Sequence, residues 1–290
     1  MTDTPAEADV PTEFTSLKYP LPHLTQALQG KAPVRIVAMG SSSTAGRADV
    51  VPYPHRLEMY LRAQFGDRIP TVDVLNRGKG GEEADAELLR FDTDIFAEKP
   101  SLVIWQVGTN AVFHKKDKPY DLDEVAAKIA VGLERLRGQP MDVVLMDPQY
   151  VTAMLLDERA EDSERMVALI SAAAEKANVN LFRRWALMRH WHVQNNIGFD
   201  QMTRPISRPS SIRETGAPSA FRERCVMRSP RRPRRRLKAS VFALGQLVKI
   251  CRSFVSGKQK HGARLHVGQS MGRAHYHETS TRSRFTSCSA

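Results

Sequence analysis

Short apolar runs alternate with longer amphipathic segments over about the first 200 residues of the chain. A period of two with β-branched residues predicts strands, and a period near 3.6 predicts helices. The run at 102–107 is almost entirely apolar, as expected for a central strand covered on both faces. The expected strands are 34–39, 72–75, 102–107, 142–146 and 179–182, and the expected helices are 54–65, 83–98, 122–137 and 158–177. This alternation predicts right-handed crossovers and a doubly wound, parallel, five-stranded α/β sheet.

The pattern ends near Met202. Residues 203–290 hold 20 Lys and Arg against 3 acidic residues, a formal charge of +17, whereas the preceding residues carry −6. This segment is rich in Arg, Pro and Ser, and burial of so few apolar residues cannot offset the entropy of ordering it. We therefore expect an N-terminal extension at 1–30, an α/β domain at 31–202 and a disordered basic tail.

Cysteine usage and hydropathy limit the other classes of function. All three cysteines lie in the tail, so the expected domain has no disulfide framework and no thiolate metal site. We expect neither a cofactor nor a metal. No segment approaches the roughly 18 apolar residues of a membrane span, and the acidic N-terminus does not have the pattern of a secretion signal. A cytoplasmic location is the default expectation.

Small and polar residues follow each of the first three expected strands. The first strand leads into Gly-Ser-Ser-Ser-Thr at 40–44, the second into a glycine-rich segment at 76–82, and the third into Gly-Thr-Asn at 108–110. Ligands of doubly wound sheets bind at the carboxyl ends of the strands, where these segments should meet. Each segment also has a purely structural interpretation, because serine and asparagine cap helices and glycines form tight turns.

Taken together, the three segments indicate acyl transfer. A serine hydroxyl can attack a carbonyl carbon, while a closely approaching glycine N–H and an asparagine amide can donate to the developing oxyanion. In order and spacing the segments resemble the G-D-S-x-T, N-x-G-x-x-G and G-x-N-D blocks of the SGNH (GDSL-like) hydrolases, over about residues 34–199. The resemblance implies a flavodoxin-like, three-layer α/β/α fold. It also implies that Ser42 is the nucleophile and that the N–H of Ser42, the N–H of Gly81 and the amide of Asn110 form the oxyanion hole.

The chain departs from the family pattern at three places. Ser41 stands where the first block has Asp, and Ala111 follows Asn110 where Asp is common. Family members also carry an Asp and, three residues later, a His that deprotonates the serine, and no such pair follows Asp200. The general base is therefore unassigned. His190 is a weak candidate, because it and His192 lie between aromatic residues on an expected helix, which favours a structural role.

A frame change near Met202 would explain both the abrupt change in composition and the missing base. Codons compatible with residues 202–221 accommodate, in another frame, a segment containing Leu-His-x-x-Asp-Trp-Ser, which resembles the last block of the family. Codon degeneracy also allows Asn, Asp or Tyr in place of this His. The frame change is therefore a hypothesis that the nucleotide sequence can decide.

These observations predict a serine ester hydrolase acting on acetyl or other short acyl esters, including O-acetylated carbohydrate, with activity impaired where the base is missing. The alternative is a non-catalytic binding protein whose basic tail contacts nucleic acid or an anionic surface. The arginine run at 231–236 has no interleaved aromatic residues, so any contact with nucleic acid is expected to be non-specific.

Overall fold

The computed structural model describes residues 10–30, 32–46, 51–65, 69–113, 120–157 and 159–203. Within these ranges, parallel strands form a sheet in the order β2-β1-β3-β4-β5. The strands are β1 (Val34–Gly40), β2 (Val72–Gly78), β3 (Leu102–Gln106), β4 (Asp142–Met146) and β5 (Asn180–Phe182). This is the strand order of flavodoxin-like folds, which confirms the expected fold class.

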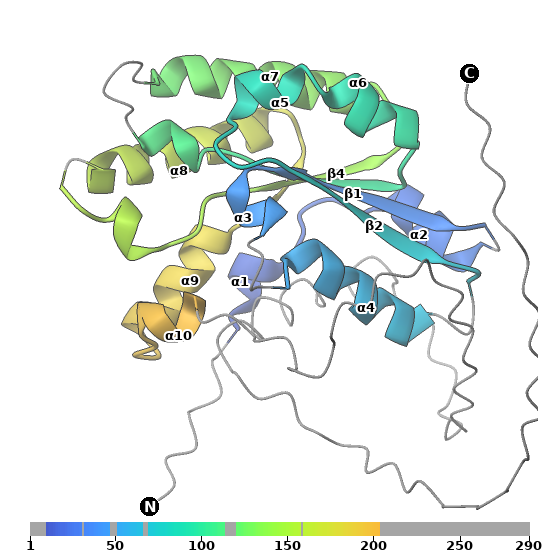
Figure 1. Ribbon diagram of the computed structural model, residues 1–290, viewed down its shortest axis with the longest axis horizontal. Coiled ribbons are helices and arrows are strands. Elements are labelled where there is room, and N and C mark those ends of the chain that lie inside the picture. Colours follow the sequence, from blue (N-terminus) through green and yellow to red (C-terminus); the bar gives the residue numbers. More distant parts are fainter. Residues whose placement is uncertain are drawn as a thin grey trace, which may run out of the picture. The chain divides into compact units, whose positions relative to one another are not determined.

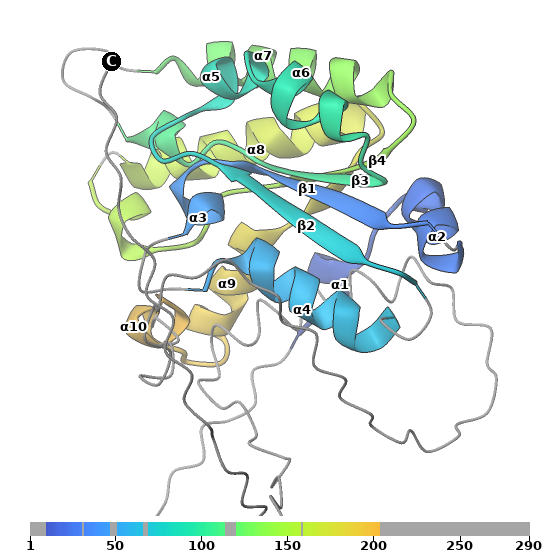
Figure 2. The same cartoon turned by 45° about the vertical axis from the view of Figure 1, so that its right-hand side comes forward.

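Helices cover both faces of the sheet, as Figure 1 and Figure 2 show. One face carries α5 (Ala84–Leu88), α6 (Phe91–Asp94), α7 (Leu122–Arg137) and α8 (Arg159–Lys176). The other face carries α1 (Thr12–Thr15), α2 (Pro22–Gln29), α4 (Tyr53–Phe65), α9 (Arg184–Val193) and α10 (Phe199–Thr203). Helix α3 (Ser42–Ala45) follows β1 directly, and single 3₁₀ turns lie at η1 (Phe96–Glu98), η2 (Asn110–Val112) and η3 (Thr152–Met154).

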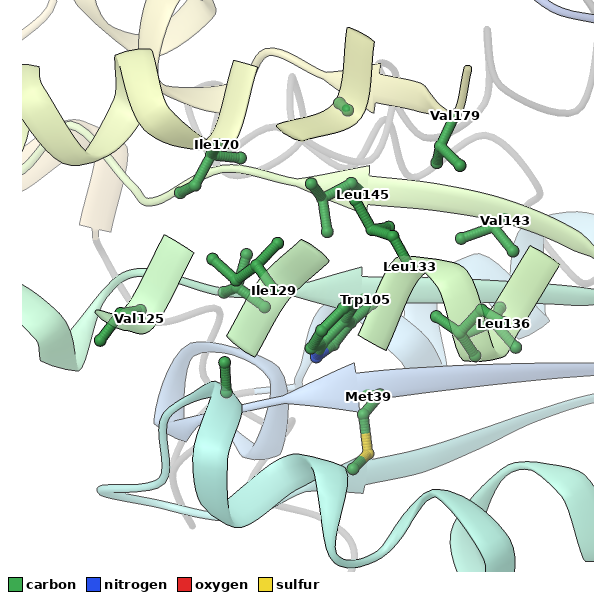
Figure 3. Close-up of a cluster of buried hydrophobic side chains, with 14 of the residues drawn as sticks. Met39, Trp105, Val125, Ile129, Leu133, Leu136, Val143, Leu145, Ile170 and Val179 are labelled. Atoms are coloured by element: carbon green, nitrogen blue, oxygen red, sulfur yellow. The ribbon is translucent and has the colours of Figure 1, made fainter. Parts of the chain in front are cut away.

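Each face of the sheet has its own apolar core, because successive strand residues point to opposite sides. Trp105 of β3 packs with Ile129 and Leu133 of α7 on one side (Figure 3), whereas its neighbour Ile104 belongs to the core on the other side. Helix α7 shows why the pattern predicted a helix here. Its buried residues recur every three or four positions, and the Asp121 side chain caps its first turn.

The segment before β1 contributes to the second core. Leu21, Leu24 and Leu28 are buried in it. The N–H of Leu24 donates to Asp142 Oδ2 at 2.8 Å, at the start of β4. The side chain of Asn180, at the start of β5, bonds both the N–H and the carbonyl of Tyr19. Residues that the sequence assigned to an extension therefore pack against the amino ends of β4 and β5.

The prediction of a single helix at 83–98 is wrong, because the structure forms three short helical segments, α5, α6 and η1, instead. The chain leaves helical geometry at Arg90, where φ is −104° and ψ is 0°. The guanidinium of Arg90 turns back to bond the carboxylate of Glu82 and the carbonyl of Arg77. The break thus connects this segment to the end of β2.

Two expectations concern membranes and the tail. None of the helices in the described ranges has the length and hydropathy needed to cross a membrane. Residues 204–290, which hold nearly all of the expected tail, lie outside the described residues. The alternative of nucleic-acid contact through this tail therefore has no structural observation behind it.

Candidate active site

Ser42 is the first residue of α3, at the carboxyl end of β1. Its side chain is exposed, and its N–H lies at a helix start, where no intrahelical acceptor exists. The turn into α3 depends on Gly40, which has a φ of 154°. A Cβ at this position would lie 2.5 Å from Thr44 Oγ1 and 2.9 Å from Gln106 Oε1, so only glycine fits.

Gln106 connects this turn to β3. Its side chain is fully buried. Its Oε1 lies within hydrogen-bond distance of the N–H and hydroxyl of Ser41 and of the hydroxyls of Ser43 and Thr44. Its Nε2 donates to Thr109 Oγ1 at 2.9 Å. One side chain therefore bridges the serine turn and the Gly-Thr-Asn turn.

The glycine-rich segment after β2 lies against α3. The N–H of Lys79 donates to the carbonyl of Gly40 at 2.9 Å, and the Asn76 amide donates to the carbonyl of Ala45 at 3.2 Å. A Cβ built on Gly80 would meet the Cβ of Ser42 at 3.8 Å, which places this segment beside the serine. Gly81 has a φ of 80° and no atom within 4 Å of where a Cβ would be, so the space on its side-chain side is open.

Asn110 joins the same assembly from the end of β3. Its Nδ2 donates to the carbonyl of Glu82 at 2.7 Å, which ties it to the residue after Gly81. An amide nitrogen carries two hydrogens, so a second one is left for a ligand. The segments that hold Ser42, Gly81 and Asn110 are thus connected by hydrogen bonds at one edge of the sheet.

Glu83 lies directly behind this assembly and is only 1% exposed. Its carboxylate accepts hydrogen bonds from the N–H groups of Ala84, Gly108, Asn110 and Ala111. Burial raises the pKa of Glu83, and the four N–H donors oppose that rise. One turn further along α5, the carboxyl of Glu87 accepts from Trp105 Nε1 at 2.6 Å.

The structure places His190 and His192 on α9, as expected from the sequence. The His190 ring packs against Phe14, with 5.8 Å between the ring centroids. The His192 ring lies 4.1 Å from that of Phe199, and its Nδ1 is 2.9 Å from the carbonyl oxygen of Ile197. Both histidines therefore pack among aromatic neighbours, and neither is assigned as the general base.

Sequence reasoning missed Gln106 and Glu83. The available signals were a glutamine at the end of an otherwise apolar strand and a second acidic residue after the paired glycines. Within the described ranges, no group of three or more His, Cys, Asp and Glu side chains could hold a metal ion.

Comparisons with known proteins show what the chain is similar to. A stretch of 88 residues is 32% identical to the uncharacterized lipoprotein YqeF of Bacillus subtilis; it covers 30% of this chain and 36%, or about a third, of that protein. Among solved structures, the fold is similar to Axe2, an acetylxylan esterase from Geobacillus stearothermophilus (TM-score 0.48, 20% identity, 55% of this chain and 80% of that one). It is also similar to the acetyl xylan esterase AlAXEase (TM-score 0.49, 22% identity, 59% and 89%).

These structural similarities concern the fold alone. The family is shown by a different comparison. Residues 7–214, more than half of the chain, match the model of the non-GDSL lipase-like family. The match confirms the resemblance to SGNH-type esterases that the three sequence blocks predicted, and the protein therefore belongs to the non-GDSL lipase-like family.

Proposed function

We propose that this protein is a serine ester hydrolase in which Ser42 Oγ attacks the carbonyl carbon of an acyl ester. The observation that carries the proposal is the convergence of an exposed serine with the segments of Gly81 and Asn110 at the carboxyl edge of the sheet. This is the edge at which doubly wound sheets bind their ligands. Membership of a lipase-like family supports the same class of reaction.

The proposed reaction has two steps. Attack by Ser42 forms a tetrahedral intermediate, whose oxyanion accepts from the N–H of Ser42, the N–H of Gly81 and the second amide hydrogen of Asn110. Collapse of the intermediate expels the alcohol and leaves an acyl group on Ser42, which water then hydrolyses. The hydroxyl proton of Ser42 goes to a base that is not assigned in this chain, and from that base to the leaving oxygen of the alcohol. Without a positioned imidazole, oxyanion stabilisation leaves only a residual rate.

We infer that the acyl group is short, with acetyl first, and that O-acetylated carbohydrate is among the alcohol components. The family resemblance supports this substrate class, and the open space at the Cβ position of Gly81 leaves room for a bulky alcohol. A series of p-nitrophenyl esters from acetate to octanoate, together with acetylated xylan, tests the inference. Acetate should be cleaved fastest, and a preference for octanoate would contradict a short-chain site.

Substitutions at the proposed site test the function itself. Ser42→Ala should abolish hydrolysis of p-nitrophenyl acetate by the full chain, and Asn110→Ala should lower the rate by about 100-fold or more. Ser43→Ala is the matched control, because the Ser43 hydroxyl bonds Gln106 and is assigned no role in attack. It should retain most of the rate, because Gln106 keeps its contacts with Ser41 and Thr44. Unchanged rates in both Ser42→Ala and Asn110→Ala would falsify the assignment.

A further inference from the structure

The carboxylate of Glu83 is saturated with backbone donors. Oε1 accepts from Ala84 N at 3.2 Å and from Gly108 N at 2.8 Å. Oε2 accepts from Asn110 N at 2.9 Å and from Ala111 N at 3.0 Å. An ionised carboxylate offers about four lone-pair sites, and here each has its own N–H. Only an acceptor with two bare oxygens fits this position.

Three of these four donors belong to the turn that carries Asn110. The same turn is also held by the carbonyl of Glu82, which accepts from Asn110 Nδ2. Glu82 and Glu83 immediately follow Gly81, so the residues that hold Asn110 are continuous in sequence with the other proposed oxyanion donor. Movement at either residue would change the distance between the two donors.

We propose that Glu83 is a positioning residue that fixes the amide of Asn110 relative to the N–H of Gly81. This inference rests on the proposed function, because it gives these two groups a common oxyanion. Glu83 does not touch the substrate. It acts by holding the backbone of the Asn110 turn, so that the amide is in place before charge develops on the substrate.

Glu87 shows that burial alone does not create this arrangement. It is as buried as Glu83, yet its carboxyl accepts from the Trp105 indole and from no backbone N–H of the described turns. Burial first, and then repulsion by Glu83, raises the pKa of Glu87 well above its ordinary range. Glu87 is therefore a core residue whose carboxyl serves Trp105 rather than the Asn110 turn, and Glu87→Gln provides a matched control.

Glu83→Gln keeps the shape of the side chain but replaces one oxygen by an NH₂ group. That group would face two backbone N–H donors, so two of the four hydrogen bonds would be lost. Amide hydrogen exchange of the full chain, measured by NMR, reports this directly. The amides of Gly108, Asn110 and Ala111 should exchange about 10-fold or more faster, because each loses its bond to a charged carboxylate and keeps at most a weaker bond to a neutral amide oxygen.

Two controls make the exchange result specific. The amide of Ile104, within β3, should exchange at the same rate in wild type and Glu83→Gln, which separates local loosening from global unfolding. Glu87→Gln should leave the three turn amides unchanged. Equal exchange at these amides in wild type and Glu83→Gln would overturn the proposal. If Glu83→Gln does not fold, Glu83→Asp keeps the charge with a shorter reach and should show a smaller increase.

A purely structural role is distinguished by kinetics. An interaction that acts on the oxyanion is made in the transition state, so Glu83→Gln should lower kcat for p-nitrophenyl acetate with little change in KM. In an Asn110→Ala background the same change should have little further effect. Equal losses in both backgrounds would show that Glu83 does not act through Asn110. No hydrolysis by the wild-type chain would contradict the proposed function, and the exchange rates would then decide alone whether Glu83 holds the turn.

Discussion

The buried side chain of Gln106 accepts a hydrogen bond from the hydroxyl of Ser43 at 2.7 Å. The orientation of its amide is fixed, because Oε1 also faces the N–H of Ser41, which can only donate, while Nε2 faces the hydroxyl of Thr109. The residues on both sides of Ser42 are therefore anchored to β3 through a single side chain. This anchoring leaves the Ser42 hydroxyl exposed beside a fixed backbone.

Replacing Gln106 by Leu should affect both stability and reactivity. The buried N–H of Ser41 would lose its acceptor, so we expect the free energy of unfolding to fall by about 1–3 kcal/mol. Labelling of Ser42 by a fluorophosphonate should slow by about 10-fold or more, because a displaced nucleophile reacts less readily. Urea unfolding and labelling kinetics measure the two effects. A destabilised variant that is labelled at the wild-type rate would show that Gln106 does not position the nucleophile.

Gly78 and Gly80 form a matched pair for the contact between α3 and β2. A Cβ on Gly78 would lie 2.2 Å from the backbone nitrogen of Ala45, and backbone cannot move aside as easily as a side-chain end. Gly78→Ala should therefore lower the free energy of unfolding by about 1–3 kcal/mol. Gly80→Ala, whose nearest contact is 3.8 Å from Ser42 Cβ, should cause no such loss. Equal stability of the two variants in urea would contradict this packing.

Asp147 should make stability depend on pH. It follows β4, is 1% exposed, and accepts from the N–H of Trp185 at 2.8 Å. Burial raises its pKa from 3.8 to about 7. The folded chain thus keeps a proton that the unfolded chain releases, so the contribution of Asp147 to stability is full below about pH 4 and is lost as the pH rises through about 7. A shift of roughly three pKa units corresponds to about 4 kcal/mol.

Asp147→Asn tests this dependence, because Asn keeps an oxygen for the N–H of Trp185 and cannot ionise. The free energy of unfolding should match the wild type near pH 4 and exceed it by up to about 4 kcal/mol at pH 8. Chemical denaturation at the two pH values measures the difference. A variant no more stable than the wild type at pH 8 would mean that Asp147 is ionised in the folded protein without penalty.

The frame-change hypothesis makes a prediction about the missing base. Restoring the alternative frame after Met202 should produce a C-terminal segment with a His that reaches Ser42. A positioned general base typically adds about 10²- to 10⁴-fold, so the restored protein should hydrolyse p-nitrophenyl acetate faster by that factor. Changing the new His to Ala should return the rate to the present level. Equal activity of both frames, or a genomic sequence that supports the present frame without interruption, would dismiss the hypothesis.

The sequence predicted the sheet well because strand and helix periodicity are local properties of the chain. The helix at 122–137 was predicted correctly, since its apolar stripe is continuous in sequence and its cap, Asp121, directly precedes it. The sequence pattern could not reveal that Leu24 joins the core, because Asp142, which accepts a hydrogen bond from the N–H of Leu24, is 118 residues away. The division of 83–98 into three turns likewise depends on long-range bonds of Arg90.

In the candidate site, too, the sequence revealed local features but not long-range contacts. Ser42, Gly81 and Asn110 could be singled out because each lies in a small, recognisable segment after a strand. Gln106 and Glu83 could not, since a buried polar residue shows its purpose only through partners distant in sequence. For Glu83, three of the four partners are backbone N–H groups 25 to 28 residues away, and backbone groups leave no trace in residue identity.

The most direct measurement is the site of covalent labelling by a fluorophosphonate, located by peptide mass spectrometry of the full chain. The reagent reacts with a serine hydroxyl and leaves a tetrahedral phosphonyl group, whose oxygen needs the same donors as an acyl oxyanion. We expect a single adduct at Ser42, absent from Ser42→Ala and formed more slowly in Asn110→Ala. Labelling that persists in Ser42→Ala, or that falls on Ser41 or Ser43 instead, would contradict the assignment of Ser42 as the nucleophile.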